Sequence, residues 1–212
     1  MFDLEYKGGN VVIITTKKET LVIDPVRSVF GLKDVVVKDA VELGTEERFL
    51  TRSPEYKVSL EGPGEYEVSD LLIRGIPAYR HLDDRNTAAK STTAYRIVDG
   101  EIQIGVLGNI DGQLDDDQLE ELGMLDILVL PIGGNGYTMD AVSAANLAGK
   151  IGPKIVVPVH WDDSKLKYEV PQDSFERFAE LMKVPIIEEK KLKIKSPSSL
   201  PESMEIYKLL VS

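Results

Sequence analysis

Two histidines, His81 and His160, are the only imidazole side chains in this sequence of 212 residues, which contains no cysteine. Without cysteine the chain forms neither disulfides nor thiolate zinc sites. Any metal ion would have to be held by imidazole nitrogens and by oxygen ligands such as carboxylates. The chemistry open to this chain therefore centres on two histidines and on the acidic residues that fold close to them.

His160 ends a buried apolar run that begins at Ile155. Buried histidines usually satisfy their hydrogen bonds inside the protein, so one interpretation is a structural histidine in a pocket. In a second interpretation, His160 is one ligand of a weak single-metal site with carboxylates such as Asp111, Asp162 or Asp83. In a third, it is a general base. The sequence leaves these alternatives open.

A glycine-rich segment, residues 133–136, lies between a buried apolar run and a segment with helical spacing. Backbone amides in such a loop can face an anion, but the Gly-Lys-Ser/Thr ending of a phosphate loop is absent. A tight turn, in which glycine adopts a positive φ, is the simpler prediction. Asp24, which precedes Pro25, is likewise typical of a turn.

The first half of the chain reads as short strands. Hairpins are predicted around the polar residues 17–19, around Ser69-Asp70 and around Asp99-Gly100, because turn residues there separate runs rich in β-branched residues. Val35–Val37 is predicted as a further strand.

The second half alternates helices with buried strands. Helices are predicted over residues 115–122, from a cap at Thr138 through Ala148, and from Pro171 onward, with strands at 126–131, 154–159, 185–187 and 205–210. Hairpins followed by β-α-β units indicate a mixed α/β (α+β) fold with helices outside the sheets. We expect a single domain that spans residues 1–212.

The net charge is −11. Proteins that bind phosphate backbones usually carry a basic face, so we expect no nucleic-acid partner. The lysines between 190 and 195 alternate with Leu192 and Ile194, which is typical of the solvated face of a strand. Because the chain shows neither a secretory signal nor an apolar run of the ~20 residues that a membrane helix needs, we expect a cytoplasmic protein without a membrane partner.

Four segments occur in an order that resembles one known family. They are Leu21-Val22-Ile23-Asp24-Pro25, Gly62–Val68 with Ile73–Pro77, Leu107-Gly108-Asn109, and Leu130–Gly134 followed by Val157–His160. Together they resemble the metallo-β-lactamase-fold hydrolases, and most closely a bacterial Zn-dependent hydrolase subgroup related to ascorbate-phosphate lactonases. The resemblance spans nearly the whole chain. It implies a four-layer αββα sandwich with a metal site at one edge between two sheets, and a homo-oligomer.

The same resemblance implies a site for two zinc ions, built from a His-x-His-x-Asp-His run, another histidine, a bridging aspartate and a final histidine. The run is expected after Val35–Val37, but residues 38–48 contain no histidine. Asn109 occupies the bridging position, where a neutral amide brings no charge to hold two cations together. His160 matches the final histidine, and Asp24 matches an aspartate that supports the site from behind.

Arg80 stands at the position of the family's second histidine, and His81 follows one residue later. A fixed positive charge there would repel a cation or replace it. We therefore expect no cofactor, and zinc or manganese only if a reduced site survives at His160 with Asp111 or His81.

Three functions follow from these residues. The first is a metal-free, non-catalytic module that binds or assembles with an unknown small molecule or protein. The second is a metal-dependent hydrolase of lactones or phosphoesters with a single-metal site at His160. The third is a sensor in which Arg80, His81 and the glycine loop bind an anion.

Overall fold

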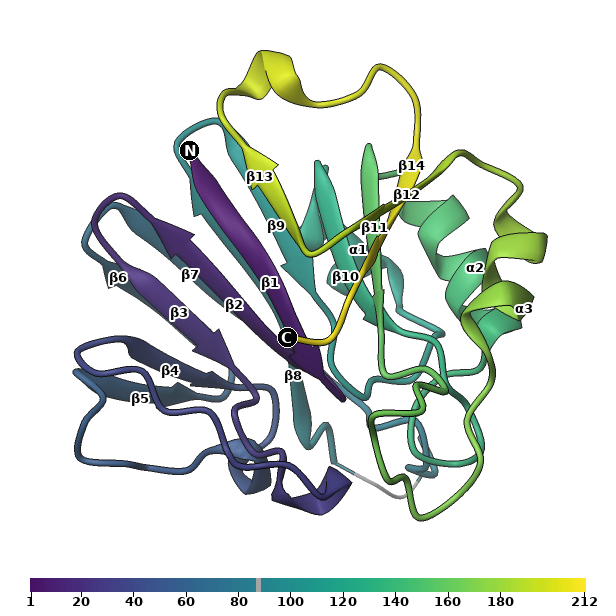
Figure 1. Ribbon diagram of the computed structural model, residues 1–212, viewed down its shortest axis with the longest axis horizontal. Coiled ribbons are helices and arrows are strands. Elements are labelled where there is room, and N and C mark those ends of the chain that lie inside the picture. Colours follow the sequence, from purple (N-terminus) through teal and green to yellow (C-terminus); the bar gives the residue numbers. More distant parts are fainter. Residues whose placement is uncertain (87–88) are drawn as a thin grey trace.

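Two β-sheets pack face to face in the computed structural model, which describes residues 1–86 and 89–212 (Figure 1). One sheet has the strand order β13 (Lys191–Ile194), β1 (Phe2–Gly8), β2 (Val11–Thr16), β3 (Thr20–Ile23), β4 (Val41–Gly44) and β5 (Val58–Glu61). The other has the order β12 (Ile186–Glu189), β14 (Glu205–Leu209), β11 (Ile155–Val159), β10 (Ile127–Pro131), β9 (Ile102–Val106), β8 (Thr92–Asp99), β7 (Leu71–Ala78) and β6 (Gly64–Val68).

Both sheets are mixed. In the larger sheet, β6 to β9 form an antiparallel meander, whereas β9, β10, β11, β14 and β12 run parallel. The predicted hairpins at Ser69-Asp70 and near Asp99 are confirmed, although Asp99 itself pairs with Ile102 so that Gly100 and Glu101 form the turn. The parallel strands matter for function, because their carboxyl ends meet at one edge of the sheet.

Helices α1 (Asp116–Leu122), α2 (Ala141–Ile151) and α3 (Phe175–Met182) lie beside the larger sheet (Figure 1). Each begins at a side-chain cap, supplied by Asp115, Asp140 and Ser174 respectively. The predicted starts at Thr138 and Pro171 are therefore wrong by a few residues. The Thr138 hydroxyl instead accepts a hydrogen bond from the Gly134 N–H. It therefore stabilises the glycine turn and does not cap α2.

The core lies between the sheets. Along β1, buried residues alternate with half-buried ones, whereas every residue of β10 and β11 is buried. This difference follows from the layers, because a central parallel strand is covered on both faces. The α/β sandwich expected from the sequence is confirmed.

The outer face of the smaller sheet is covered by irregular chain. Ile13 and Val22 pack there against Tyr56 and against Val35 and Val37. The segment Val35–Val37 is not a strand, so that prediction is wrong. It packs its side chains on the sheet without joining the ladder, and the Tyr56 hydroxyl ties it down by donating to the Val35 carbonyl at 2.5 Å.

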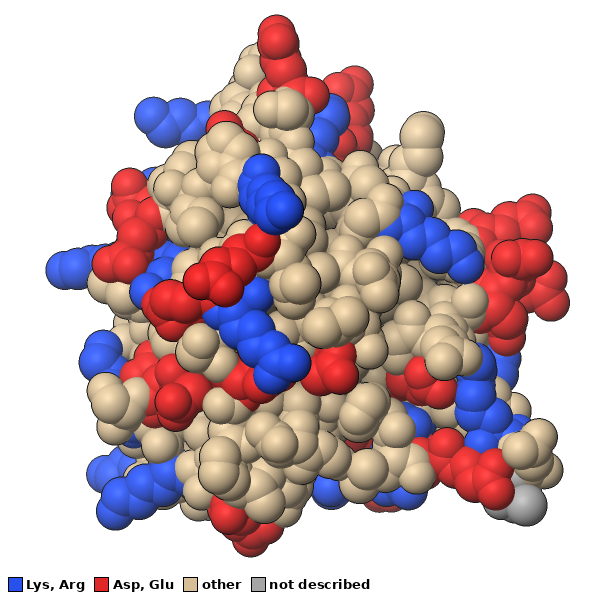
Figure 2. All heavy atoms as spheres, turned by 90° about the vertical axis from the view of Figure 1, so that its right-hand side faces the viewer, with Lys and Arg blue, Asp and Glu red and all other residues tan. Residues whose placement is uncertain are grey.

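Charged side chains of both signs are interspersed on the face that carries α2 and α3 (Figure 2). No helix within residues 1–86 and 89–212 is long and apolar enough to cross a membrane. The lysines of β13 point outward as expected, since Leu192 and Ile194 are buried and Lys193 is exposed.

Candidate functional site

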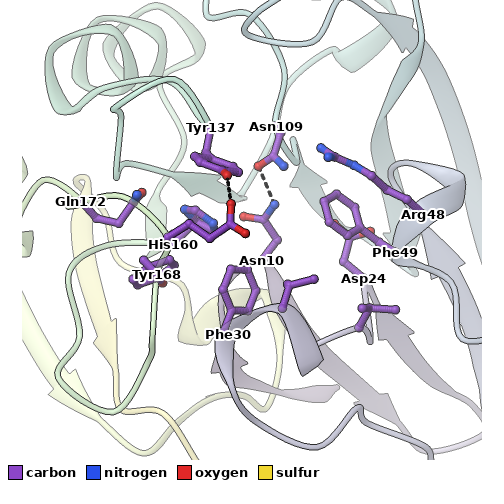
Figure 3. Close-up of a pocket in the computed structure, with 13 residues that line it drawn as sticks. Asn10, Asp24, Phe30, Arg48, Phe49, Asn109, Tyr137, His160, Tyr168 and Gln172 are labelled. Atoms are coloured by element: carbon purple, nitrogen blue, oxygen red, sulfur yellow. Dashed lines mark hydrogen bonds between the residues drawn. The ribbon is translucent and has the colours of Figure 1, made fainter.

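A cavity of about 290 Å³ opens at the edge where the carboxyl ends of several strands meet (Figure 3). Its walls come from both sheets. The lining residues are Asn10, Asp24, Val26, Val29, Phe30, Arg48, Phe49, Asn109, Tyr137, His160, Tyr168, Glu169 and Gln172. They follow β1, β3, β4, β9, β10 and β11, so elements far apart in sequence build one pocket.

Asp24 follows β3 and is buried, with a positive φ of 52°. Its two carboxylate oxygens accept hydrogen bonds from the Thr45 backbone N–H and hydroxyl, each at 2.7 Å. Burial raises the pKa of Asp24 to about 7, although the Thr45 hydrogen bonds act in the opposite direction. A non-glycine residue rarely adopts this backbone conformation unless its surroundings hold it there.

Arg48 and Phe49 lie in the short 3-10 helix η2 (Glu47–Phe49), which follows β4. The buried Glu46 carboxylate accepts a hydrogen bond from Arg48 Nη2 at 3.0 Å, and its other oxygen forms an ion pair with Arg48 Nε at 2.9 Å. The guanidinium also lies over the Phe49 ring, 4.7 Å from its centroid. Figure 3 shows Arg48 directed from this side toward the middle of the cavity.

Asn109 follows β9 and is buried at the junction of the two sheets. Its Oδ1 accepts a hydrogen bond of 2.6 Å from Asn10 Nδ2 (Figure 3). The preceding Gly108 has a φ of 60°, and a Cβ atom there would lie 2.7 Å from the Thr45 side chain. Glycine is needed at this point because the two sheets approach each other closely.

His160 follows β11 and is buried, again with a positive φ of 51°. Its backbone N–H donates to the Tyr6 hydroxyl at 3.2 Å. The imidazole packs against the rings of Phe30 and Tyr168, with centroid distances of 5.4 Å and 4.9 Å. Burial lowers the pKa of His160 to about 4, so the imidazole is neutral at neutral pH.

The third part of the wall comes from two loops that meet at the mouth of the cavity. The Tyr137 hydroxyl donates a hydrogen bond to the Glu169 carboxylate, which joins the loop after β10 to the loop before α3. This bond raises the pKa of the Tyr137 hydroxyl. Gln172 lies deeper, and its Nε2 donates to the carbonyls of Val170 and Pro171.

Unpartnered polar atoms concentrate at this cavity. Within residues 1–86 and 89–212, six buried side-chain nitrogen or oxygen atoms lack a hydrogen-bond partner, and four belong to residues that line it. These four are Asn10 Oδ1, His160 Nδ1, Tyr168 OH and Gln172 Oε1. Two of them still have a polar neighbour, because the Gln172 side chain lies beside His160 and the Tyr6 side chain lies beside Tyr168. Because buried polar atoms are nearly always paired with protein, water or ligand, their concentration makes this cavity the candidate binding site.

The residues singled out from the sequence divide into two groups. His160, Asn109 and Asp24 line the cavity, whereas Arg80, His81, Asp111 and Asp162 are not among its lining residues. Arg80 is paired with Asp83 at 3.0 Å, and Asp111 with Arg85 at 3.5 Å. His81 donates its backbone N–H to the Asn109 carbonyl, and Asp162 is exposed.

The sequence does not single out several lining residues. Arg48 and Phe49 are among them, because the Val35–Val37 run predicts the strand that precedes the site, whereas that strand is β4. Tyr137, Tyr168 and Gln172 lie in loops without a motif. The one sequence signal for these residues is the pair Gly8-Gly9 before Asn10. In the structure a Cβ atom on Gly9 would lie 2.2 Å from the Phe30 ring, so this backbone approaches the cavity closely.

Comparison with known proteins identifies the family to which this fold belongs. Residues 3–160 match the model of the β-lactamase superfamily domain family. The chain belongs to the metallo-β-lactamase superfamily. A solved structure from Thermotoga maritima, a candidate Zn-dependent hydrolase of this superfamily, aligns over 99% of this chain and 98% of that one, with a TM-score of 0.78 and 18% identity. A candidate metal-dependent hydrolase from Parabacteroides distasonis aligns with a TM-score of 0.66 and 17% identity, over 99% of this chain and 94% of that one.

Two curated proteins are similar to this chain in sequence. A metal-dependent hydrolase of Archaeoglobus fulgidus is 26% identical over 132 residues, which is 59% of this chain and 56% of that protein. One of Thermococcus onnurineus is 31% identical over 100 residues, which is 47% of this chain and 44% of that protein. The chain thus spans about half the length of the curated relatives that it matches.

The residues at the cavity do not fit the zinc ions implied by the superfamily. No group of three or more His, Cys, Asp or Glu side chains in the described part of the chain is arranged to hold a metal ion. Of the positions that match the family's site, Asp24 accepts from Thr45 and the Asn109 oxygen accepts from Asn10. The guanidinium of Arg48 lines the same wall in an ion pair with Glu46, and it offers no ligand atom to a metal ion. A zinc ion needs several imidazole or carboxylate ligands around one point.

Proposed function

We propose that this metallo-β-lactamase superfamily member binds a small organic molecule in the cavity and does not use a dinuclear zinc centre. The observation that carries the proposal is the concentration of four unpartnered buried polar atoms in residues that line one cavity. In a fully packed core, almost every buried polar atom has a hydrogen-bond partner within the protein. Polar atoms that bind a ligand find their partner on that ligand.

The size and the lining of the cavity support the same conclusion. A volume of about 290 Å³ is close to the lower end of the ~300–1,000 Å³ typical of small-molecule sites. Phe30, Phe49 and Tyr168 supply apolar surface, and the polar groups of Asn10 and Gln172 supply orientation. Most small-molecule sites combine these two features.

Two measurements test the proposal. Metal content is determined by mass spectrometry on protein purified without a metal-binding tag, before and after incubation with zinc and manganese. A fragment panel is then screened by ligand-observed NMR. We expect metal far below one ion per chain, together with fragments that bind the wild type and lose binding when Asn10→Leu fills the pocket. Stoichiometric zinc that is lost in His160→Ala would overturn the proposal.

A second function is favoured by one observation, which is that His160 keeps an unpartnered Nδ1 beside the cavity. This nitrogen is free to be one ligand of a reduced single-metal site in a hydrolase of lactones or phosphoesters. If His160→Ala leaves both the metal content and any such hydrolysis unchanged, this alternative fails. A homo-oligomeric state and a cytoplasmic location also stay predictions, and sedimentation equilibrium tests the first of them.

A further inference from the structure

The cavity is rich in aromatic rings that come from different loops. The rings of Phe30, His160 and Tyr168 form a cluster in which each lies tilted or edge-on to the other two, with centroid distances of 4.9–5.4 Å. Tyr137 and Phe49 line the cavity as well. Figure 3 shows that Phe49 lies on the opposite side from Tyr168, with Asn10 between them.

The polar groups of the cavity are mainly acceptors. Glu169 contributes a carboxylate at the mouth, and Asn10 Oδ1 and Gln172 Oε1 are buried carbonyl oxygens without a donor. The orientation of the Gln172 amide is fixed, since its nitrogen donates to two backbone carbonyls. The unpartnered groups of this site therefore accept more hydrogen bonds than they donate.

The charges at the cavity favour a positive ligand. Arg48 is already paired with Glu46 through two nitrogen atoms, so its charge is largely balanced within the wall. His160 is neutral, because burial holds its pKa near 4. Glu169 accepts a hydrogen bond from the Tyr137 phenol at the mouth, and no Lys or Arg of the described residues forms an ion pair with it.

We infer that the ligand is a small organic cation, an amine or quaternary ammonium compound, whose positive head lies among the aromatic rings and near Glu169. The faces of aromatic rings carry negative potential, so they attract a cation that water hydrates weakly. A carboxylate at the mouth adds to this attraction, and the carbonyl oxygens accept hydrogen bonds from an amine or hydroxyl group. This inference rests on the proposed function and names the chemical class of its ligand.

Choline and its neutral isostere, in which a quaternary carbon replaces the nitrogen, have nearly the same shape and differ in charge. Their affinities for the full chain are compared by calorimetry and by ligand-observed NMR. We expect choline to bind roughly tenfold or more tightly than the isostere, as a partly desolvated cation–π contact predicts. Butyrate, an anion of similar size, is the third probe, and we expect it to bind most weakly.

Two matched variants locate the effect. Glu169→Gln keeps the shape of the side chain and removes its charge, so we expect it to weaken choline by several-fold and to leave the isostere unchanged. Glu180→Gln is the control, because Glu180 is an exposed residue of α3 that does not line the cavity. Both substitutions are at exposed positions, so the variants fold.

The outcomes separate the two proposals. If the isostere or butyrate binds as well as choline and Asn10→Leu abolishes that binding, the cavity takes small molecules but not by their positive charge, and this inference is overturned alone. If none of the three probes binds, this inference is overturned, and the fragment panel then decides the proposed function. If Glu169→Gln and Glu180→Gln weaken choline equally, the contact is non-specific and the inference is also overturned.

Discussion

The two walls of the cavity differ in how they are built. The wall that follows β9, β10 and β11 holds Asn109 and His160 at the ends of strands whose residues are almost all buried. The wall that follows β3 and β4 holds Asp24, Arg48 and Phe49 on two loops, which are fixed by the Asp24–Thr45 hydrogen bonds and the Arg48–Glu46 ion pair. One wall is positioned by a packed sheet and the other by a polar network.

This difference shows what the superfamily fold preserves. Buried strands must keep their apolar side chains to form the core, so the backbone at their ends stays in place. Side chains beyond those ends face the cavity and do not contribute to core packing. They can therefore be replaced by chemically different residues without loss of the fold. The loop after β4 therefore carries Glu46 and Arg48 where the resemblance led us to expect histidines.

The largest expected effect concerns the support of the polar wall. Glu42 is fully buried in β4, and its carboxylate accepts hydrogen bonds from the N–H of Thr51 at 2.6 Å and of Arg52 at 3.2 Å, and from the hydroxyls of Thr51 and Ser59. Glu42→Ala leaves these donors unpartnered, so we expect the free energy of unfolding to fall by about 3–5 kcal/mol. Urea denaturation measures it.

The exposed Glu47 of the same loop is the matched control for Glu42. It pairs with Arg52 at the surface, at 3.2 Å, and such pairs contribute about 0–1 kcal/mol. If Glu42→Ala and Glu47→Ala destabilise the protein equally, the polar wall does not depend on the buried carboxylate.

The next effect compares the ionisable group of each wall. The pKa of Asp24 is about 7 in the folded protein and about 3.9 in an unfolded chain. The folded state therefore keeps a proton that the unfolded state releases, and this carboxyl lowers stability as the pH rises from about 4 to 7.

The pKa of His160 is about 4 when folded and about 6.5 when unfolded. The unfolded state then binds the extra proton, so His160 raises stability as the pH rises from about 4 to 6.5.

These two contributions oppose each other, and they amount to about 4 kcal/mol for Asp24 and about 3 kcal/mol for His160. In Asp24→Asn we expect the free energy of unfolding to increase between pH 4 and 6.5. In His160→Gln we expect the free energy of unfolding to decrease between pH 4 and 7. Unfolding in urea across this pH range, monitored by circular dichroism, measures both profiles. Two variant profiles that both parallel the wild type would show that neither group is buried as the structure has it.

The smallest effect concerns the backbone of the wall that follows β10 and β11. A Cβ atom on Gly133 would lie 2.3 Å from the His160 carbonyl oxygen and 2.3 Å from Gln172 Oε1. Gly133→Ala must therefore displace the wall, and we expect a loss of about 2 kcal/mol together with loss of fragment binding. Gly149→Ala in α2 meets nothing within 4 Å, so we expect it to stabilise the protein by about 0.5–1 kcal/mol. Thermal unfolding and NMR compare the two, and a stable, binding-competent Gly133→Ala would contradict the geometry of this wall.

Local sequence patterns determined most of the elements, because they depend on near neighbours. The alternation of apolar residues predicted the strands of both halves, and the capping box of Asp115 with Gln118 fixed the start of α1. Val35–Val37 misled the prediction, since three β-branched residues favour a strand locally, yet the chain there pairs with no neighbouring strand and packs its side chains on the sheet. The predicted helix start at Pro171 is also wrong, because the Ser174 side chain caps α3.

The sequence by itself determined that the chain folds as an α/β sandwich, that it has only two histidines, and that His160 directly follows a buried strand. Only the tertiary structure decided which side chains share the cavity. Arg80 and His81 are close in sequence to the expected site, but they follow β7, and the described structure engages Arg80 with Asp83. Tyr137, Tyr168 and Arg48 come from three separate loops. Their meeting depends on how two sheets pack, and no local pattern encodes a distance between segments that are far apart in the chain.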